Sequence, residues 1–172
     1  MSSIYFFRGK AATGKTLLSD KLSRKKNIAV LRKDDIFDRN SKYIADNSLN
    51  NQITYDVLAK LIQTNIDNQA DVIVDVGLSS VSGLNTFLSK IDFSKAKLYC
   101  FYCDCSDPEI WRNRLEQRLK NPAPNQFFDN IDKIVEYYEN SDTEMRRDEI
   151  LIDSIEDADI LIEKILNEIS TL

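Results

Sequence analysis

The stretch Gly9-Lys10-Ala11-Ala12-Thr13-Gly14-Lys15-Thr16 follows directly on the apolar run Ile4-Tyr5-Phe6-Phe7. It matches the pattern G-x-x-x-x-G-K-[ST], in which a turn bracketed by glycines joins a strand to a helix and aims backbone N–H groups at phosphate. In this pattern Lys15 neutralises the β- and γ-phosphates, and the hydroxyl of Thr16 is a ligand for Mg²⁺. The sequence therefore predicts a nucleotide site that extends from Gly9 to Leu17.

The composition limits the class of protein further. The chain has 172 residues, a net charge of -5 and no histidine. This length suits a single domain, which we expect to cover residues 1–172. The acidic charge favours neither nucleic acid nor an anionic membrane, and the first residues show no basic and apolar leader. We therefore expect a cytoplasmic protein without a membrane span, whose general base is a carboxylate, lysine, tyrosine or thiolate.

Three cysteines lie close together in one apolar segment. Cys100, Cys103 and Cys105 belong to an expected strand, where alternation places Cys100 on the opposite face from the other two. Because the chain also lacks histidine, we expect reduced thiols in the core and no structural zinc site.

Short apolar runs alternate with helical patterns along the whole chain. Strands are predicted at residues 3–7, 28–31, 72–76, 97–103 and 149–152. Helices are predicted at residues 15–24, 53–68, 81–90, 108–120, 128–138 and 156–168. This alternation predicts an α/β sandwich around a parallel sheet.

Two polar stretches interrupt this pattern. Residues 40–50 are rich in turn formers, and residues 120–125 contain two prolines. They are interpreted as loops that form a lid or bind the acceptor, with ordinary surface connections as the alternative.

Charged residues follow the second and third predicted strands, where ligands gather in a sheet of this type. Asp75 ends the third strand and is expected to bind Mg²⁺ through water or through Thr16, or simply to cap the next helix. Gly77 follows it.

After the second strand comes Arg32-Lys33-Asp34-Asp35. Asp34 is the preferred general base for an acceptor hydroxyl, and Asp35 competes for this role. The alternative is that the pair caps a helix starting at Ile36, while Arg32 and Lys33 balance its charge.

Arg114 and Arg118 are four residues apart on one face of a predicted helix. Guanidinium groups stabilise the charge that develops during phosphoryl transfer, so we expect both arginines to contact phosphates from a lid around residues 112–128. A solvated helix face is the alternative.

Taken in this order, the phosphate loop, Lys33-Asp34-Asp35 and the Arg-x-x-x-Arg helix resemble P-loop kinases of the polynucleotide-kinase and zeta-toxin type. The likeness covers nearly the whole chain. It implies a three-layer α/β/α sandwich with a five-stranded parallel sheet, of the P-loop NTPase, nucleoside monophosphate kinase-like type, with a helical lid. It also implies transfer of the γ-phosphoryl group of ATP, with Mg²⁺, to a hydroxyl, with Asp34 as base.

The acceptor is left open by this resemblance. Polynucleotide kinases have an arginine shortly after the paired aspartates, whereas here Ile36-Phe37-Asp38 precede Arg39. A small molecule or nucleotide derivative is therefore favoured, with Asp35, Arg32, Arg39 and Gly77 as candidate acceptor residues. The alternatives are a polynucleotide 5′-hydroxyl kinase, whose groove would be Arg32, Lys33 and Arg39, and a binding module that senses ATP without transferring phosphate.

Overall fold

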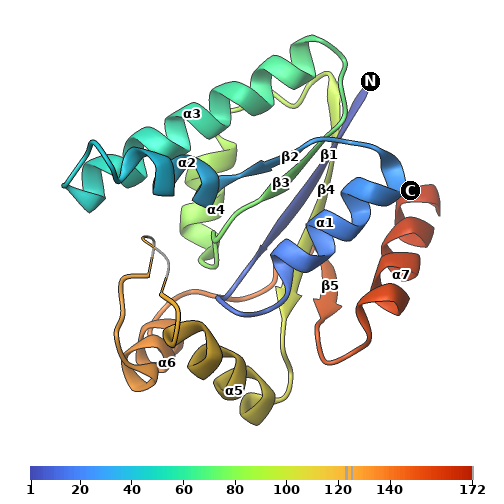
Figure 1. The fold of residues 1–172 in the computed structure, drawn as a ribbon. Helices are drawn as coiled ribbons and strands as arrows, with labels where there is room; N and C mark the ends of the chain where they lie inside the picture. Colours follow the sequence, from blue (N-terminus) through green and yellow to red (C-terminus); the bar gives the residue numbers. More distant parts are fainter. Residues whose placement is uncertain (123, 125, 172) are drawn as a thin grey trace.

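The chain folds around one parallel sheet of five strands in the order β2-β3-β1-β4-β5 (Figure 1). The computed structural model describes residues 1–122, 124 and 126–171. The strands are β1 (Ser2–Gly9), β2 (Val30–Arg32), β3 (Val72–Asp75), β4 (Ala96–Asp104) and β5 (Ile150–Asp153). The helices are α1 (Lys15–Lys26), α2 (Lys33–Asn40), α3 (Asn47–Asp67), α4 (Val81–Leu88), α5 (Pro108–Leu119), α6 (Ile131–Glu139) and α7 (Ala158–Thr171).

Strand β1 lies at the centre of the sheet and is buried along most of its length. Ile4 and Phe6 pack into a core with α3 and α4, whereas Tyr5 and Phe7 pack into a second core with α1 and α7. Because side chains alternate between the faces of a strand, a continuous apolar run serves both cores. The predicted three-layer α/β/α sandwich with a five-stranded parallel sheet is therefore confirmed.

Cys100 and Cys103 follow the same alternation, whereas Cys105 lies just after β4 and not, as predicted, in the strand. Cys100 belongs to the core under α3 and α4, and Cys103 to the core under α1 and α7. All three cysteines are buried and free, and burial raises the pKa of the Cys103 thiol to about 12.

Helices α5 and α6 form a third, smaller cluster beyond the carboxyl end of β4 (Figure 1). Its buried residues are Cys105, Trp111, Leu115 and Ile134, and Ala11 and Ala12 of the phosphate loop pack against it. The helical pair therefore rests on the loop between β1 and α1.

Several predicted boundaries were wrong. Residues 40–50 are not a single loop, because α3 begins at Asn47; the Asp46 side chain caps it by accepting hydrogen bonds from the N–H groups of Ser48 and Leu49. Helix α6 begins at Ile131, after its cap Asn130, rather than at residue 128. Helix α7 begins at Ala158 rather than at residue 156. In the predicted loop 120–125, residues 123 and 125 lie outside the described residues.

Within the described residues, we find no helix that is both long enough and apolar enough to span a membrane.

Candidate active site

The phosphate loop connects β1 to α1 in a conformation that depends on its two glycines. Gly9 has a φ of 138° and Gly14 a φ of 81°, values that residues with a Cβ rarely adopt. A Cβ on Gly9 would lie 2.0 Å from the carbonyl oxygen of Cys103 in the neighbouring strand β4. The first glycine therefore allows β1 to approach β4 closely just before the chain turns.

Lys15 begins α1 and points back into this loop. Its Nζ donates to the carbonyl oxygen of Lys10 at 2.5 Å. Burial lowers the pKa of Lys15, and the nearby carboxylate of Asp75 opposes this shift. The side chain is thus a desolvated cation at the start of a helix, where an anion would relieve the cost of its burial.

Thr16 and Asp75 form a hydrogen-bonded pair beside the loop. The Thr16 hydroxyl donates to Asp75 Oδ2 at 2.7 Å, and Asp75 is 7% exposed. Burial raises the pKa of Asp75, while Lys15 and the hydrogen bond from Thr16 act in the opposite direction. A hydroxyl and a carboxylate at the carboxyl end of a central strand are a donor set that suits Mg²⁺. Among the described residues, no group of three or more acidic or cysteine side chains forms a metal cluster of its own.

Helix α2 places two carboxylates in its first turn. It begins at Lys33, so Asp34 and Asp35 lie inside the helix, and the interpretation of this pair as caps of a helix starting at Ile36 was wrong. Their position suits the positive end of the helix dipole. The side chain of Asp34 is 50% exposed and lies 4.0 Å from the Lys33 ammonium.

The neighbouring cations are already engaged. The Lys33 ammonium is 7% exposed and lies 4.0 Å above the ring of Phe37. Burial lowers the pKa of Lys33, and Asp34 opposes this shift. Arg32 pairs with Asp20 and lies 3.7 Å from Asp75.

The structure separates the two arginines of α5. Arg118 lines the same cavity as the phosphate loop, and its Nε donates to Gln126 Oε1 at 3.1 Å. Arg114 instead donates to the hydroxyl of Ser154 at 2.7 Å and to its carbonyl oxygen at 2.8 Å, after strand β5. Arg39, in the last turn of α2, is exposed and is not among the cavity residues that the structure describes.

One cavity of about 700 Å³ joins these groups. From the predicted site it contains residues 11–17 of the phosphate loop together with Arg32, Asp34, Asp35, Asp75, Gly77 and Arg118. Lys10 lies to one side, with its ammonium 3.0 Å from Asp104 and 4.9 Å from the centre of the Trp111 ring. Lys33, which the sequence analysis named for the polynucleotide-kinase alternative, also lines the cavity. The sequence analysis did not identify a further set of lining residues, namely Asn51, Tyr55, Gln126, Phe127, Phe128, Tyr137 and Tyr138.

The helical pair contacts the phosphate loop through Ala11. Trp111 of α5 donates from its indole nitrogen to the Ala11 carbonyl at 2.8 Å. The Ala11 N–H donates to the hydroxyl of Tyr138 in α6 at 2.9 Å. Both polar groups of one loop residue are therefore held by side chains that lie 100 and 127 positions away, which no local pattern indicates.

A second feature that the sequence analysis missed is the buried Arg8, directly before the loop. Its guanidinium is fully buried and binds Glu149 through two hydrogen bonds of 2.5 and 2.6 Å. It also donates to the carbonyl oxygens of Ser79 at 2.7 Å and Glu144 at 2.8 Å. Arg8 thus fixes the end of β1 to the segment after β3 and to the segment before β5.

A strand, a glycine-bracketed loop, a helix with its lysine and threonine, and an aspartate at the end of the neighbouring strand define a P-loop nucleotide-binding fold. A family model for an AAA domain (AAA_33) matches residues 4–137, and the chain belongs to this family. A comparison with curated proteins found no match.

Solved structures share the fold at low sequence identity. A putative kinase from Chloroflexus aurantiacus has a TM-score of 0.73 at 12% identity, over 99% of this chain and 97% of that one. A gluconokinase from Sinorhizobium meliloti has a TM-score of 0.68 at 11% identity, over 99% and 92%. A shikimate kinase from Acinetobacter baumannii, in complex with shikimate, has a TM-score of 0.66 at 16% identity, over 99% and 94%.

Proposed function

We propose that this protein is a kinase that transfers the γ-phosphoryl group of Mg·ATP to a hydroxyl of a small molecule. One observation carries the proposal: the phosphate loop, with Lys15, and the carboxylate of Asp34 line one continuous cavity. A protein that only binds a nucleotide has no need of a carboxylate across the cavity from the phosphates. The kinases among the structures that share the fold support the same conclusion.

The residues around the phosphate loop suit the nucleotide end of the reaction. The loop N–H groups and Lys15 bind the phosphates, while Thr16 and Asp75 hold the magnesium ion. When bound, magnesium neutralises charge on the β- and γ-phosphates. The Thr16 hydroxyl and the Asp75 carboxylate already lie 2.7 Å apart, so their oxygens are placed together before the ion arrives.

In the same cavity, Asp34 is the general base. The acceptor oxygen forms a bond to the γ-phosphorus, the bond from this phosphorus to the β–γ bridging oxygen breaks, and the hydroxyl proton passes to the Asp34 carboxylate. The products are the phosphorylated acceptor and ADP. Asp35 also lines the cavity, and its side chain is 72% exposed, so it remains the alternative base.

The segment around residues 112–128 is the lid in this proposal. Arg118 lines the cavity and stabilises the negative charge on the transferred group. Arg114 contacts Ser154 in the present structure, so its contact with the nucleotide requires the bond to Ser154 to be exchanged. The phosphate loop and the lid then hold the nucleotide together.

The test measures ADP release from Mg·ATP by the purified protein, with and without a panel of hydroxylated acceptors. Stimulation by one acceptor is expected, and Asp34→Asn should reduce turnover on the order of 10² to 10⁴-fold while nucleotide affinity is retained. Asp35→Asn separates the two candidate bases, since it removes an equal charge one residue away: a larger loss of turnover in this variant than in Asp34→Asn would make Asp35 the base.

Two results would contradict the proposal. Tight ATP binding without any stimulated turnover would favour the ATP-sensing module. Stimulation only by 5′-hydroxyl oligonucleotides, with binding that falls steeply as salt is added, would favour the polynucleotide kinase.

A further inference from the structure

The acceptor end of the cavity has an aromatic wall. Tyr55 of α3, Phe127 and Phe128 before α6, and Tyr137 of α6 all line it. The Phe127 ring packs edge-on against Phe37 of α2, with 5.9 Å between ring centres. Flat apolar side chains in a cavity provide stacking surfaces for a ring-shaped ligand.

Phe127 is 56% exposed, although it belongs to this wall. A large apolar side chain that is fixed at one edge and open to solvent on the rest of its surface gains free energy when a ligand covers it. Phe128 follows it in the chain and packs on Tyr137, with 5.4 Å between the ring centres of Phe128 and Tyr137. The wall is thus assembled from neighbouring rings rather than from one exposed residue.

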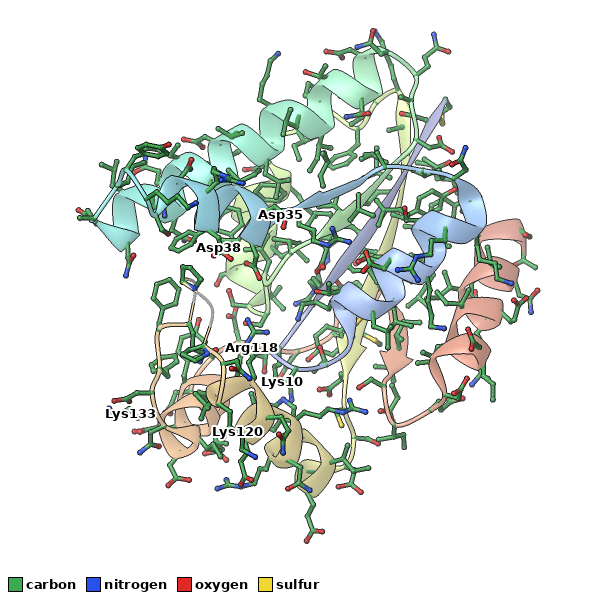
Figure 2. All side chains as sticks on the ribbon, viewed as in Figure 1. Lys10, Asp35, Asp38, Arg118, Lys120 and Lys133 are labelled. Carbon is green, nitrogen blue, oxygen red and sulfur yellow. The ribbon has the colours of Figure 1, made fainter. Side chains whose placement is uncertain are left out.

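The charges at this end of the cavity oppose an anionic acceptor. Asp34 and Asp35 line it, and Asp38 lies one turn further along α2. In Figure 2, Asp35 and Asp38 project from α2 toward the α5 region, from which Arg118 points back toward them. Three carboxylates in one short helix repel a phosphate or carboxylate on the acceptor.

Two cations that line this part of the cavity are each paired with a carboxylate. Lys33 is paired with Asp34 and buried against Phe37, and Arg32 is paired with Asp20. Arg118 is the cation that the proposed function assigns to the transferred phosphoryl group. The described part of the cavity therefore suits an acceptor without charge.

The cavity also contains amide side chains. Asn51 of α3 and Gln126 both line it. The amide of Gln126 already accepts from Arg118 and donates to the carbonyl oxygen of Phe128, so Asn51 is the amide that offers a donor and an acceptor to a ligand. Amide groups of this kind pair with the polar edges of nucleobases.

From the aromatic wall, the amide of Asn51 and the charge balance, we propose that the acceptor is an uncharged nucleoside, phosphorylated on its primary ribose hydroxyl. The inference rests on the proposed kinase function and names its acceptor. The base stacks on the aromatic wall, and the ribose hydroxyl reaches Asp34. The 5′ oxygen binds the γ-phosphorus, its proton passes to Asp34, and ADP leaves, so a nucleoside and ATP give a nucleoside 5′-monophosphate and ADP.

The experiment compares three matched acceptors in the ADP-release assay: each common nucleoside and deoxynucleoside, its 3′-phosphate, and ribose held in its furanose form as methyl β-D-ribofuranoside. All three have a primary hydroxyl; the 3′-phosphate adds an anion, and ribose lacks the base. At least one nucleoside should exceed both its 3′-phosphate and ribose in kcat/KM by roughly tenfold or more, because of like-charge repulsion and lost stacking.

Variants of exposed aromatic residues provide the second readout. Phe127→Ala should raise the KM for the nucleoside roughly 5- to 150-fold with little change in kcat, the range for loss of one base-stacking contact. Tyr43→Ala is the control, because Tyr43 is 84% exposed and is not a described cavity residue. Both side chains are largely exposed, so neither variant is expected to unfold the protein.

Several outcomes would overturn the inference. Ribose as good as every nucleoside would exclude the stacking role, and a 3′-phosphate better than its nucleoside would indicate the end of a nucleic acid strand as acceptor. Turnover stimulated by another hydroxylated molecule, such as shikimate or a hexose, but by no nucleoside, would reject the nucleoside and retain the kinase. No turnover with any acceptor would reject both.

Discussion

Replacing Arg8 with methionine tests the buried ion pair at the end of β1. The methionine fills part of the arginine's volume but removes the two hydrogen bonds to Glu149 at 2.5 and 2.6 Å. Glu149 then keeps the N–H of Arg146 at 2.7 Å and the thiol of Cys100 at 3.2 Å. A carboxylate that is buried without its counter-charge is costly.

The expected loss is about 3–5 kcal/mol of unfolding free energy, the usual range when one partner of a buried ion pair is removed. The carbonyl oxygens of Ser79 and Glu144 also lose their donor, which places the loss toward the upper end. The free energy of unfolding of a typical domain is only about 5–15 kcal/mol, so the variant should be only marginally stable.

Urea unfolding followed by circular dichroism measures this loss. Lys25→Met is the matched control, because it removes a cation from the exposed pair with Glu163 and should cost less than about 1 kcal/mol. The double variant Arg8→Met/Glu149→Met should recover most of the stability, since it leaves no buried charge. If Arg8→Met cost no more than Lys25→Met, the assignment of a large energetic role to this pair would be refuted.

Three further predictions concern the same region. Lys15→Met should stabilise the nucleotide-free protein at neutral pH, because burial penalises the charged form of Lys15 and so lowers its pKa. This gain in stability should shrink as the pH rises toward 10.5. In calorimetry, nucleotide should no longer raise the Tm of this variant. Burial alone would raise the pKa of Glu149, but hydrogen bonds, first that from Arg8, leave it lowered. Wild-type stability should therefore fall relative to Arg8→Met/Glu149→Met as the pH drops below 4.5, measured by urea unfolding. Tyr138→Phe frees the Ala11 N–H for phosphate and should tighten Mg·ATP binding roughly 2- to 10-fold in a calorimetric titration, whereas weaker binding would contradict this reasoning.

The fold and the phosphate loop were predictable because their signals are local. The glycine spacing, the apolar run of β1 and the aspartate that ends β3 are each contained in a few consecutive residues. The helix that carries Asp34 was placed three residues too late, because a propensity pattern does not show that Arg32 leaves an extended conformation at Lys33.

Features that depend on distant residues were not predictable from one sequence. Arg8 resembles an ordinary charge at a strand end until Glu149 is brought beside it. Arg114 and Arg118 have the same spacing pattern, yet Ser154 binds one of them and the cavity contains the other. The aromatic wall joins α3 to the segment before α6, two regions that no periodicity connects.

The position of Arg8 has a consequence for the order in which the protein can fold. Arg8 belongs to the central strand, but the carboxylate that neutralises it follows 141 residues later. At a synthesis rate of about 5–20 residues per second, roughly 7 to 28 s separate the two residues on a ribosome. Throughout that interval, closing the sheet around β1 would bury a guanidinium without its partner. The nascent chain therefore gains the full stability of the sheet around β1 only when strand β5 is being made.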